Sequence, residues 1–171
     1  MSFDLSEDHQ MVKDMVKKLA DEEIAPRAAH YDETREFPWE NCKKLAELGL
    51  MGVTVPEEYG GAGMDTLAYV TVIEELSRAC ASTGVVAAVQ NSLATFPLLK
   101  FGTEELKKKY LPQLASGEKI GAYALTEPNA GSDAASLKTT CRLEGDHWVL
   151  DGQKNWITNS TAAEIYIVYA T

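Results

Sequence analysis

The sequence predicts an α+β fold in which an all-α N-terminal domain precedes a small, unfinished β domain. Through residues 1–121, apolar side chains repeat at the spacing of one helix face. After Gly121 the pattern changes to period two, with many β-branched residues. Only about four short strands follow before Thr171, which lies in or just after an apolar strand. We therefore expect a helical domain at 1–121, a partial β domain at 122–171 and a longer parent protein.

The first predicted helix runs from Ser6 to Ile24. Ser6 can cap its start, and the acidic residues Glu7 and Asp8 suit the positive end of the helix dipole. Pro26 is expected to end it, because proline lacks the N–H that an interior helical residue donates. One face of the helix carries the apolar residues Met11, Val12, Met15, Val16 and Leu19.

Four more helices are expected before Gly121, of which three have clear end signals. One opens at Pro38 and ends before Gly49. The next is capped by Asp65 or Thr66, after a glycine-rich loop that lacks the Gly-Lys-Ser/Thr of a phosphate loop. The last is capped by Thr103 and carries its acidic residues first.

Between the last two of these three helices lies the fourth, residues 85–102, which is apolar on almost every face. Such a helix is buried, either in a core or along a ligand cavity. Gln90, Asn91 and Ser92 interrupt it with polar groups that need partners if they are buried. Two interpretations stay open: hydrogen bonds inside a helix bundle, or contact with a substrate.

Four strands are expected after the helices. The segments are 121–126, 139–144, a hairpin within 147–158 and 163–171, the last apolar enough to be covered on both faces. The dipeptide Asp151–Gly152 is a strong signal for the tight turn of that hairpin.

Composition excludes several functional classes. The formal net charge of −10 disfavours nucleic acid as a partner. Cys42, Cys80 and Cys141 lie far apart, and the three His residues are scattered, so we expect neither a disulfide framework nor a metal site. No apolar run approaches the roughly 18 residues of a membrane helix, and the acidic start lacks the apolar core of a secretion signal. We expect a reducing, cytoplasmic location without a membrane span.

The stretch "YALTEPNAGSDAAS" at 123–136 interrupts the strands with a polar turn. Pro128 fixes the backbone, Gly131 permits a positive φ, and Thr126 and Ser132 add hydroxyls. Successive N–H groups of such a turn can hold an anion, so the turn suits a phosphate with a flat ligand on the strand behind it. The alternative is a polar connection in which Asp133 or Asn129 bonds its own backbone.

Together with three other segments, this stretch resembles the acyl-CoA dehydrogenase family, flavoenzymes that oxidise the α–β bond of acyl-CoA thioesters. The segments are "PEEYGG" at 56–61, "FGTEELKKKYLPQLASGEKIGAYALTEPNAGSD" at 101–133 and "DGQKNWITNS" at 151–160. They occur in the family's order, and the resemblance covers essentially the whole chain. The stretch "NSLATFPLLKFG" at 91–102 is most similar to the short-chain, butyryl-CoA dehydrogenase branch of the family. The family fold would make residues 122–171 the first strands of a β-barrel domain.

The resemblance implies an FAD site. Thr126 would bond the isoalloxazine edge, Trp156 would pack on the ring system, and the Thr158 hydroxyl would approach the flavin N5. Ser132 would lie near the pyrophosphate and the acyl-CoA, and Gln90 and Asn91 are further candidates for substrate contact. Glu127 and Asp133 are expected to shape the turn. The full set of implied cofactor-binding residues is Tyr123, Ala124, Leu125, Thr126, Gly131, Ser132, Trp156, Ile157 and Thr158.

The resemblance also implies that this chain cannot act alone. In the family a carboxylate base takes the α-proton as the β-hydride goes to the flavin, and electrons then pass to an electron-transfer flavoprotein. That base lies in a C-terminal domain, beyond Thr171, and none of Glu74, Glu75 and Glu127 matches it. The complete protein is expected to be a homo-oligomer, a tetramer or dimer. Two alternatives stay open: a non-catalytic or split subunit that needs a complementary chain, and a related acyl-CoA oxidase or flavin monooxygenase.

Overall fold

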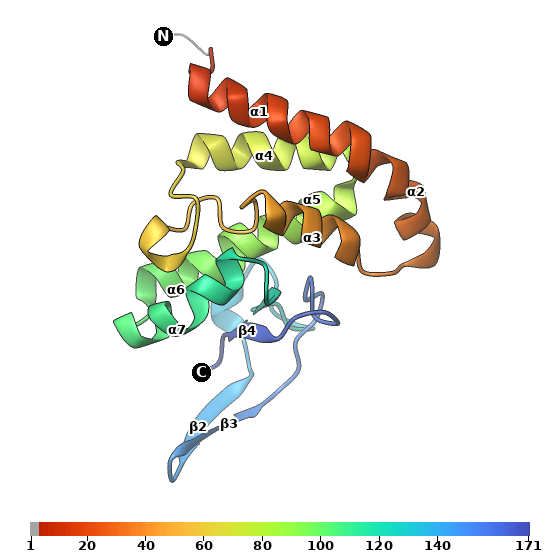
Figure 1. The fold of residues 1–171 in the computed structure, drawn as a ribbon. Helices are drawn as coiled ribbons and strands as arrows, with labels where there is room; N and C mark the ends of the chain where they lie inside the picture. Colours follow the sequence, from red (N-terminus) through yellow and green to blue (C-terminus); the bar gives the residue numbers. More distant parts are fainter. Residues whose placement is uncertain (1–3) are drawn as a thin grey trace.

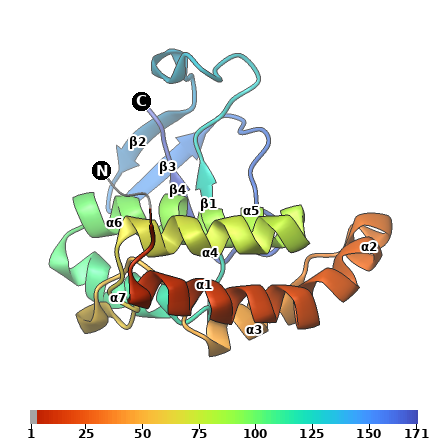
Figure 2. The same ribbon diagram turned by 90° about the horizontal axis from the view of Figure 1, so that it is seen from above.

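A computed structural model describes residues 4–171, in which a layer of helices is followed by two small sheets (Figures 1 and 2). This order confirms the predicted α+β class. The segment 1–3, part of the acidic start considered above, lies outside the described residues. The helical elements are α1 (Glu7–Leu19), η1 (Ala20–Ile24), α2 (Ala25–Thr34), α3 (Trp39–Glu47), η2 (Glu57–Tyr59), α4 (Thr66–Ala79), α5 (Ala81–Ala88), η3 (Val89–Ala94), α6 (Thr95–Phe101), α7 (Glu104–Ala115) and η4 (Ala134–Ser136). The strands are β1 (Gly121–Ala124), β2 (Thr140–Glu144), β3 (His147–Asp151) and β4 (Ile165–Val168).

The first helix does not end at Pro26, contrary to the prediction. The π-helical turn η1 joins α1 to α2, which continues to Thr34 with Pro26 in its first turn. A π turn widens the helix locally and shifts its hydrogen-bond pattern by one residue. Because proline is tolerated where its missing N–H is not required, the widened turn carries the chain past Pro26.

The predicted helix caps at Ser6, Asp65 and Thr103 are present. The side chain of Asp65 accepts a hydrogen bond from Ala68 N at 2.9 Å, and those of Ser6 and Thr103 accept longer ones three residues on. The main core lies among α1, α3, α4, α5 and the loop after α3, and its fully buried members include Val16, Ile24, Leu45, Met51, Val53, Val72, Leu76 and Ala87. Within residues 4–171 no helix is both long and apolar enough to cross a bilayer.

The segment predicted as a buried apolar helix is the continuous run of α5, η3 and α6, which lies between α4 and the strands (Figure 1). Most of η3 is buried, including Val89, Gln90, Asn91 and Ala94. The central part of the run, η3, is a second π-helical turn after η1. The run is not covered all round, since Leu93 and Phe96 remain partly exposed.

The strands form two separate pairs. β1 and β4 pair in parallel, with Gly121 opposite Ile165 and Ala124 opposite Val168. β2 and β3 form an antiparallel hairpin that projects away from the helices (Figure 1). No closed barrel is present in the described part of the chain, in line with the expected incomplete β domain.

Two details of the strand prediction are wrong. The hairpin turns at Gly145–Asp146, where Gly145 has φ +64°, and Asp151 ends β3 rather than opening a turn. Gly145 takes the left-handed conformation that a two-residue hairpin loop requires, so the earlier Gly-Asp pair makes the reversal. Strand β4 is not covered on both faces, because Tyr166 and Val168 keep 45% and 40% of their surface exposed.

Candidate functional site

Two segments far apart in the sequence line one pocket, here called the β1 pocket, of about 220 Å³. The end of β1 supplies one wall, the turn at 156–158 a second, and the π turn η3 the apolar floor. The lining residues are Val89, Leu93, Tyr123, Leu125, Thr126, Trp156, Ile157 and Thr158. The pocket therefore gathers residues from both of the segments that the sequence singled out for a flavin.

Hydrogen bonds hold the two segments together. Asn155 N donates to Thr126 O at 2.9 Å, and the Lys154 ammonium donates to Leu125 O at 3.1 Å. Lys154 also lies 2.8 Å from Glu127 Oε1, and both side chains are largely buried. Sequence reasoning missed Lys154 and Asn155, although both lie inside the segment "DGQKNWITNS".

Glu127 shapes the turn, as expected. Its carboxylate accepts hydrogen bonds from Lys138 N at 2.6 Å and Thr139 N at 2.9 Å, besides its bond to Lys154. The Lys154 ammonium and these N–H groups lower the pKa of Glu127 to about 2. A carboxylate that stays ionised and fully engaged is a poor general base, so its role is structural.

Trp156 is the most unusual residue of the pocket. Its φ of +58° lies in the left-handed region, and its side chain is 90% exposed. A non-glycine residue held in that conformation carries strain, and a large aromatic ring left in water loses the burial that normally stabilises it. The ring is thus presented at the rim of the β1 pocket, free to stack on a flat ligand.

Of the other predicted cofactor residues, Tyr123 lines the β1 pocket, whereas Ala124, Gly131 and Ser132 lie outside it. Ala124 is buried beside the pocket, and Tyr123 packs its ring on Tyr169 at a centroid distance of 5.1 Å. Burial raises the pKa of Tyr123 to about 12. Gly131 and Ser132 are exposed on the following turn and do not line the pocket. Gly131 does not use the positive φ that glycine permits, and the turn closes through paired bonds between Glu127 and Ala130.

The amides of Gln90 and Asn91 bond the protein backbone, so the structure favours the bundle interpretation over direct substrate contact. Gln90 donates to Leu114 O and Lys119 O and accepts from Gly121 N. Asn91 donates to Leu50 O and Ala87 O and accepts from Val53 N. Every side-chain N–H of the two residues is used in these bonds.

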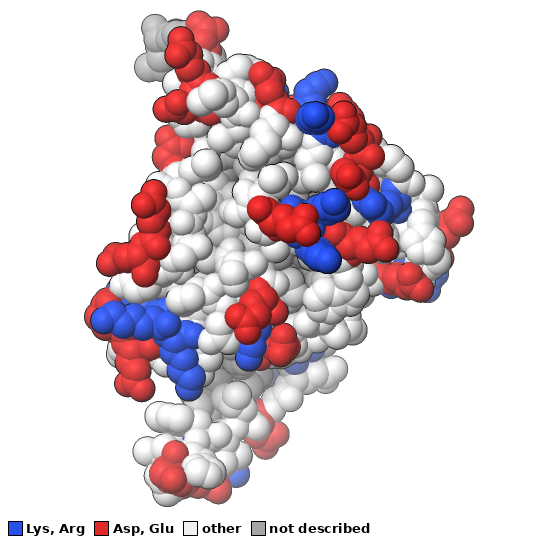
Figure 3. Space-filling view, viewed as in Figure 1, with Lys and Arg blue, Asp and Glu red and all other residues white. Residues whose placement is uncertain are grey.

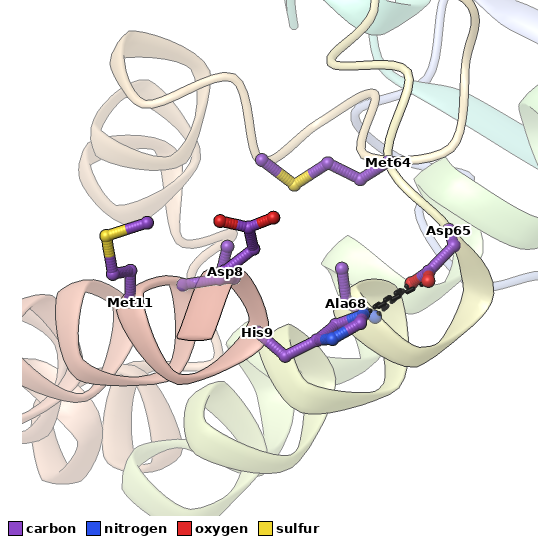
Figure 4. A pocket seen from close by; sticks show the side chains of 7 residues that line it. Asp8, His9, Met11, Met64, Asp65 and Ala68 are labelled. Carbon is purple, nitrogen blue, oxygen red and sulfur yellow. Dashed lines mark hydrogen bonds and ion pairs between the residues drawn. The ribbon is translucent and has the colours of Figure 1, made fainter. Parts of the chain in front are cut away.

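Two pockets of more than 400 Å³ lie away from the β1 pocket. One, of about 470 Å³, is on the other side of η3 and is lined by Thr54, Met64, Asp65, Thr66, Tyr69, Asn91, Ser92, Phe96 and Leu99. The second, of about 410 Å³, lies between the first turns of α1 and α4 and is shown in Figure 4. There His9 Nε2 lies 3.0 Å from Asp65 Oδ1 beside the apolar side chains of Met11 and Met64.

Carboxylates are spread over the face shown in Figure 3, and most of its Lys and Arg groups lie beside an Asp or Glu. The ion pairs of the described residues include Arg78 with Asp21 and Arg27 with Glu40. No group of three or more His, Cys, Asp or Glu side chains within residues 4–171 is arranged to hold a metal ion. The side chains that line the β1 pocket offer the hydroxyls of Thr126 and Thr158 and the aromatic rings of Tyr123 and Trp156.

Comparison with known proteins shows the family of this chain. The family model described as acyl-CoA dehydrogenase, N-terminal domain, matches residues 6–118, and the one described as acyl-CoA dehydrogenase, middle domain, matches residues 122–171. The probable acyl-CoA dehydrogenase YngJ of Bacillus subtilis is 51% identical over 170 residues, which are 99% of this chain and 45% of that protein. The short-chain specific acyl-CoA dehydrogenase of Clostridium acetobutylicum is 48% identical with the same coverage.

Solved structures give the same result. Butyryl-CoA dehydrogenase from Megasphaera elsdenii superposes with a TM-score of 0.93 at 36% identity, over 99% of this chain and 45% of that one. An acyl-CoA dehydrogenase complexed with FAD from Bacillus anthracis gives 0.91 at 44% identity, over 98% and 29%. The chain thus spans less than half the length of these relatives. On its sequence, its fold and both family models, it belongs to the acyl-CoA dehydrogenase family.

Proposed function

We propose that this chain supplies the helical domain and the flavin-ring face of an FAD-dependent acyl-CoA dehydrogenase, with the boundary between its domains after Gly121. The complete enzyme would oxidise the α–β bond of a short acyl-CoA to the 2-enoyl-CoA. One observation carries the proposal: segments 123–126 and 156–158 meet at a single pocket beside the buried π turn η3.

The residues of the β1 pocket fit a flavin ring. Its floor is apolar, through Val89 and Leu93, whereas Thr126 and Thr158 offer hydroxyls at the wall. A flat heteroaromatic ring needs both an apolar surface for its faces and hydrogen-bonding groups at its edge. The exposed ring of Trp156, carried on a left-handed backbone, has the chemistry of a stacking partner.

Within this proposal each group has one task. Thr126 and Thr158 would orient and polarise the ring edge, Trp156 would cover one ring face and exclude water, and Tyr123, Ala124, Leu125 and Ile157 would hold the apolar contact. Bound FAD would supply the acceptor for the substrate hydride. Gly131 and Ser132 would approach the phosphate-bearing end of the cofactor, since both are exposed on the turn that continues from Thr126.

The substrate would be a short acyl-CoA. The names of the Clostridium and Megasphaera relatives, short-chain specific acyl-CoA dehydrogenase and butyryl-CoA dehydrogenase, support that class. Ser132 is the residue proposed here for contact with it. Two carboxylates of the chain are already engaged, Glu75 with Arg78 and Glu127 with Lys154, which is consistent with a catalytic base supplied by residues beyond Thr171.

The electron acceptor proposed is an electron-transfer flavoprotein. This chain matches a chain in a solved structure with a TM-score of 0.95 at 43% identity. That structure is described as the electron transferring flavoprotein of Acidaminococcus fermentans. We further propose a homo-oligomer for the complete protein. A reducing compartment such as the cytoplasm is supported by the free thiols of Cys42, Cys80 and Cys141.

The test is a visible absorption spectrum of the purified complete protein, titrated anaerobically with butyryl-CoA. An oxidised flavin band that bleaches on titration supports a dehydrogenase. A protein that purifies colourless and takes up no FAD would overturn the proposal. A flavin that stays oxidised until a second chain is added would support the split-subunit alternative instead. Rapid reoxidation of the reduced flavin by oxygen would support the oxidase or monooxygenase alternative.

A further inference from the structure

We propose that Gln90 and Asn159 are positioning residues of the β1 pocket, which together hold Gly121 and thereby set the spacing between its two walls. The inference rests on the proposed function, because the group that the walls would grip is the flavin ring. Neither side chain needs to touch the cofactor. Both act through the backbone of a single glycine at the start of β1.

Gln90, the second residue of the π turn η3, binds three backbone groups. It is fully buried, and its Oε1 accepts a hydrogen bond from Gly121 N at 2.8 Å. Its amide donates to Leu114 O at 2.8 Å and to Lys119 O at 3.0 Å. One side chain therefore joins the pocket floor to the end of α7 and to the first residue of β1.

Asn159 holds the same glycine from the opposite side. Its Nδ2 donates to Gly121 O at 3.1 Å, so both backbone polar groups of Gly121 are bound by side chains. Asn159 is 7% exposed and has φ +68°, which is left-handed. Its Oδ1 has no hydrogen-bond partner among the described residues. A buried polar atom without a partner and a left-handed backbone both lower the stability of the folded protein. The hydrogen bond from Asn159 to Gly121 offsets part of this cost.

Packing leaves Gly121 no freedom to move toward η3. A Cβ placed on it would lie 2.4 Å from Ala94 Cβ and 3.0 Å from Leu114 Cδ2. The strand therefore touches the helical layer directly at this point. Gly121 starts the strand that leads to Leu125 and Thr126, and Asn159 directly follows the turn at 156–158. Gly121 therefore anchors both walls of the β1 pocket: one wall continues from it along β1, and the other is joined to it through Asn159.

The functional consequence concerns distance. Groups that orient a reacting ring act well only when they are held within a fraction of an ångström, because electrostatic and hydrogen-bonding effects fall steeply with misplacement. Loss of either bond to Gly121 would let one wall shift against the other. The wall hydroxyls of Thr126 and Thr158 would then no longer meet the ring edge together.

Asn91 offers a matched control. It follows Gln90 in the same π turn, is 2% exposed and also makes three hydrogen bonds to backbone groups. Its partners Leu50, Val53 and Ala87 belong to the helical part and to the loop after α3, away from β1. Gln90→Leu and Asn91→Leu therefore remove equal numbers of buried bonds, but only the first frees Gly121.

The experiment uses the complete, FAD-loaded protein and measures FAD affinity, the flavin absorption spectrum without substrate, and amide hydrogen exchange of the apoprotein. We expect Gln90→Leu to weaken FAD binding about tenfold or more. It should also shift the flavin band and speed exchange in a peptide covering 121–124. Asn91→Leu should lower the melting temperature to a similar extent but speed exchange around Val53 and leave the flavin band unshifted. Asn159→Gly, which keeps the left-handed backbone and removes only the side-chain bond, should behave like a milder Gln90→Leu.

If Gln90→Leu does not fold, Asn159→Gly still tests the inference, because glycine accepts the φ of +68° at that position and the variant should fold. An unchanged flavin band and unchanged exchange at 121–124 in Asn159→Gly would overturn the inference. Equal shifts of the flavin band in Gln90→Leu and Asn91→Leu would also overturn it, by showing a general loss of packing. A wild-type protein that takes up no FAD contradicts the proposed function, and that result is seen before any variant is made.

Discussion

The ammonium of Lys154 lies 2.8 Å from Glu127 Oε1 and 3.1 Å from Leu125 O, so one side chain joins the two walls of the β1 pocket. The Lys154 and Glu127 side chains keep only 12% and 7% of their surface exposed. A buried pair of this kind is strongly coupled, because removal of one partner leaves the other charge desolvated and unpaired. The pair therefore connects the stability of the turn with the shape of the pocket.

Lys154→Met should loosen the pocket and lower stability together. It removes the bond to Leu125 O and leaves Glu127 without its cation, and we expect FAD to bind about tenfold more weakly. The measurement is FAD affinity, with the melting temperature of the apoprotein beside it. Lys138→Met is the control, since it removes the same charge from an exposed side chain. Equal losses of FAD affinity in the two variants would contradict the role given to Lys154.

Acid should unfold the protein partly through Glu127. Its pKa falls from 4.5 to about 2 in the folded state, so the folded protein binds the proton less readily than the unfolded chain. The stability that this carboxylate contributes is complete above pH 4.5 and is lost as the pH falls toward 2. Glu127→Gln should be less stable at neutral pH and should show a flatter loss of stability between those two values. Urea unfolding at a series of pH values measures both effects, and an unchanged slope would contradict them.

Gly121→Ala should destabilise the fold by about 2 kcal/mol, the usual cost of forcing an extra methyl group into a packed site. The new Cβ would meet Ala94 Cβ at 2.4 Å. Gly131→Ala is the matched control, because a Cβ there meets nothing within 4 Å and the residue has no positive φ. Its stability should change by less than about 0.5 kcal/mol. Denaturant unfolding compares the two, and a neutral Gly121→Ala would contradict the close packing of β1 on η3.

Thr158→Val should shift the flavin absorption spectrum and slow flavin reduction by the substrate. The change keeps the shape of the side chain and removes the hydroxyl that the pocket wall offers. The control is Thr161→Val, because Thr161 is exposed and does not line the β1 pocket. Rapid mixing with butyryl-CoA under anaerobic conditions measures the rate. Unchanged kinetics in Thr158→Val would remove Thr158 from its proposed role.

Local sequence patterns were enough to predict most of the helices. The caps at Ser6, Asp65 and Thr103 depend on residues within one turn, and the sequence predicts all three, with Thr66 as an alternative to Asp65. The continuation past Pro26 was not predicted, because a π turn has no simple pattern of its own. The sequence predicts the hairpin turn at Asp151–Gly152, whereas the chain turns at Gly145–Asp146, because both dipeptides carry a turn signal and only strand pairing distinguishes them.

The family, the succession of a helical part and a β part, and the two segments that line the β1 pocket followed from the sequence alone, because these depend on short runs of residue types. Tertiary structure alone decided that Gln90 binds Gly121, that Lys154 joins Glu127 to Leu125, and that Trp156 is left exposed in a left-handed turn. Such contacts join residues that are far apart in the chain. Their energies depend on burial and on distances of a few tenths of an ångström, which the order of residue types does not encode locally.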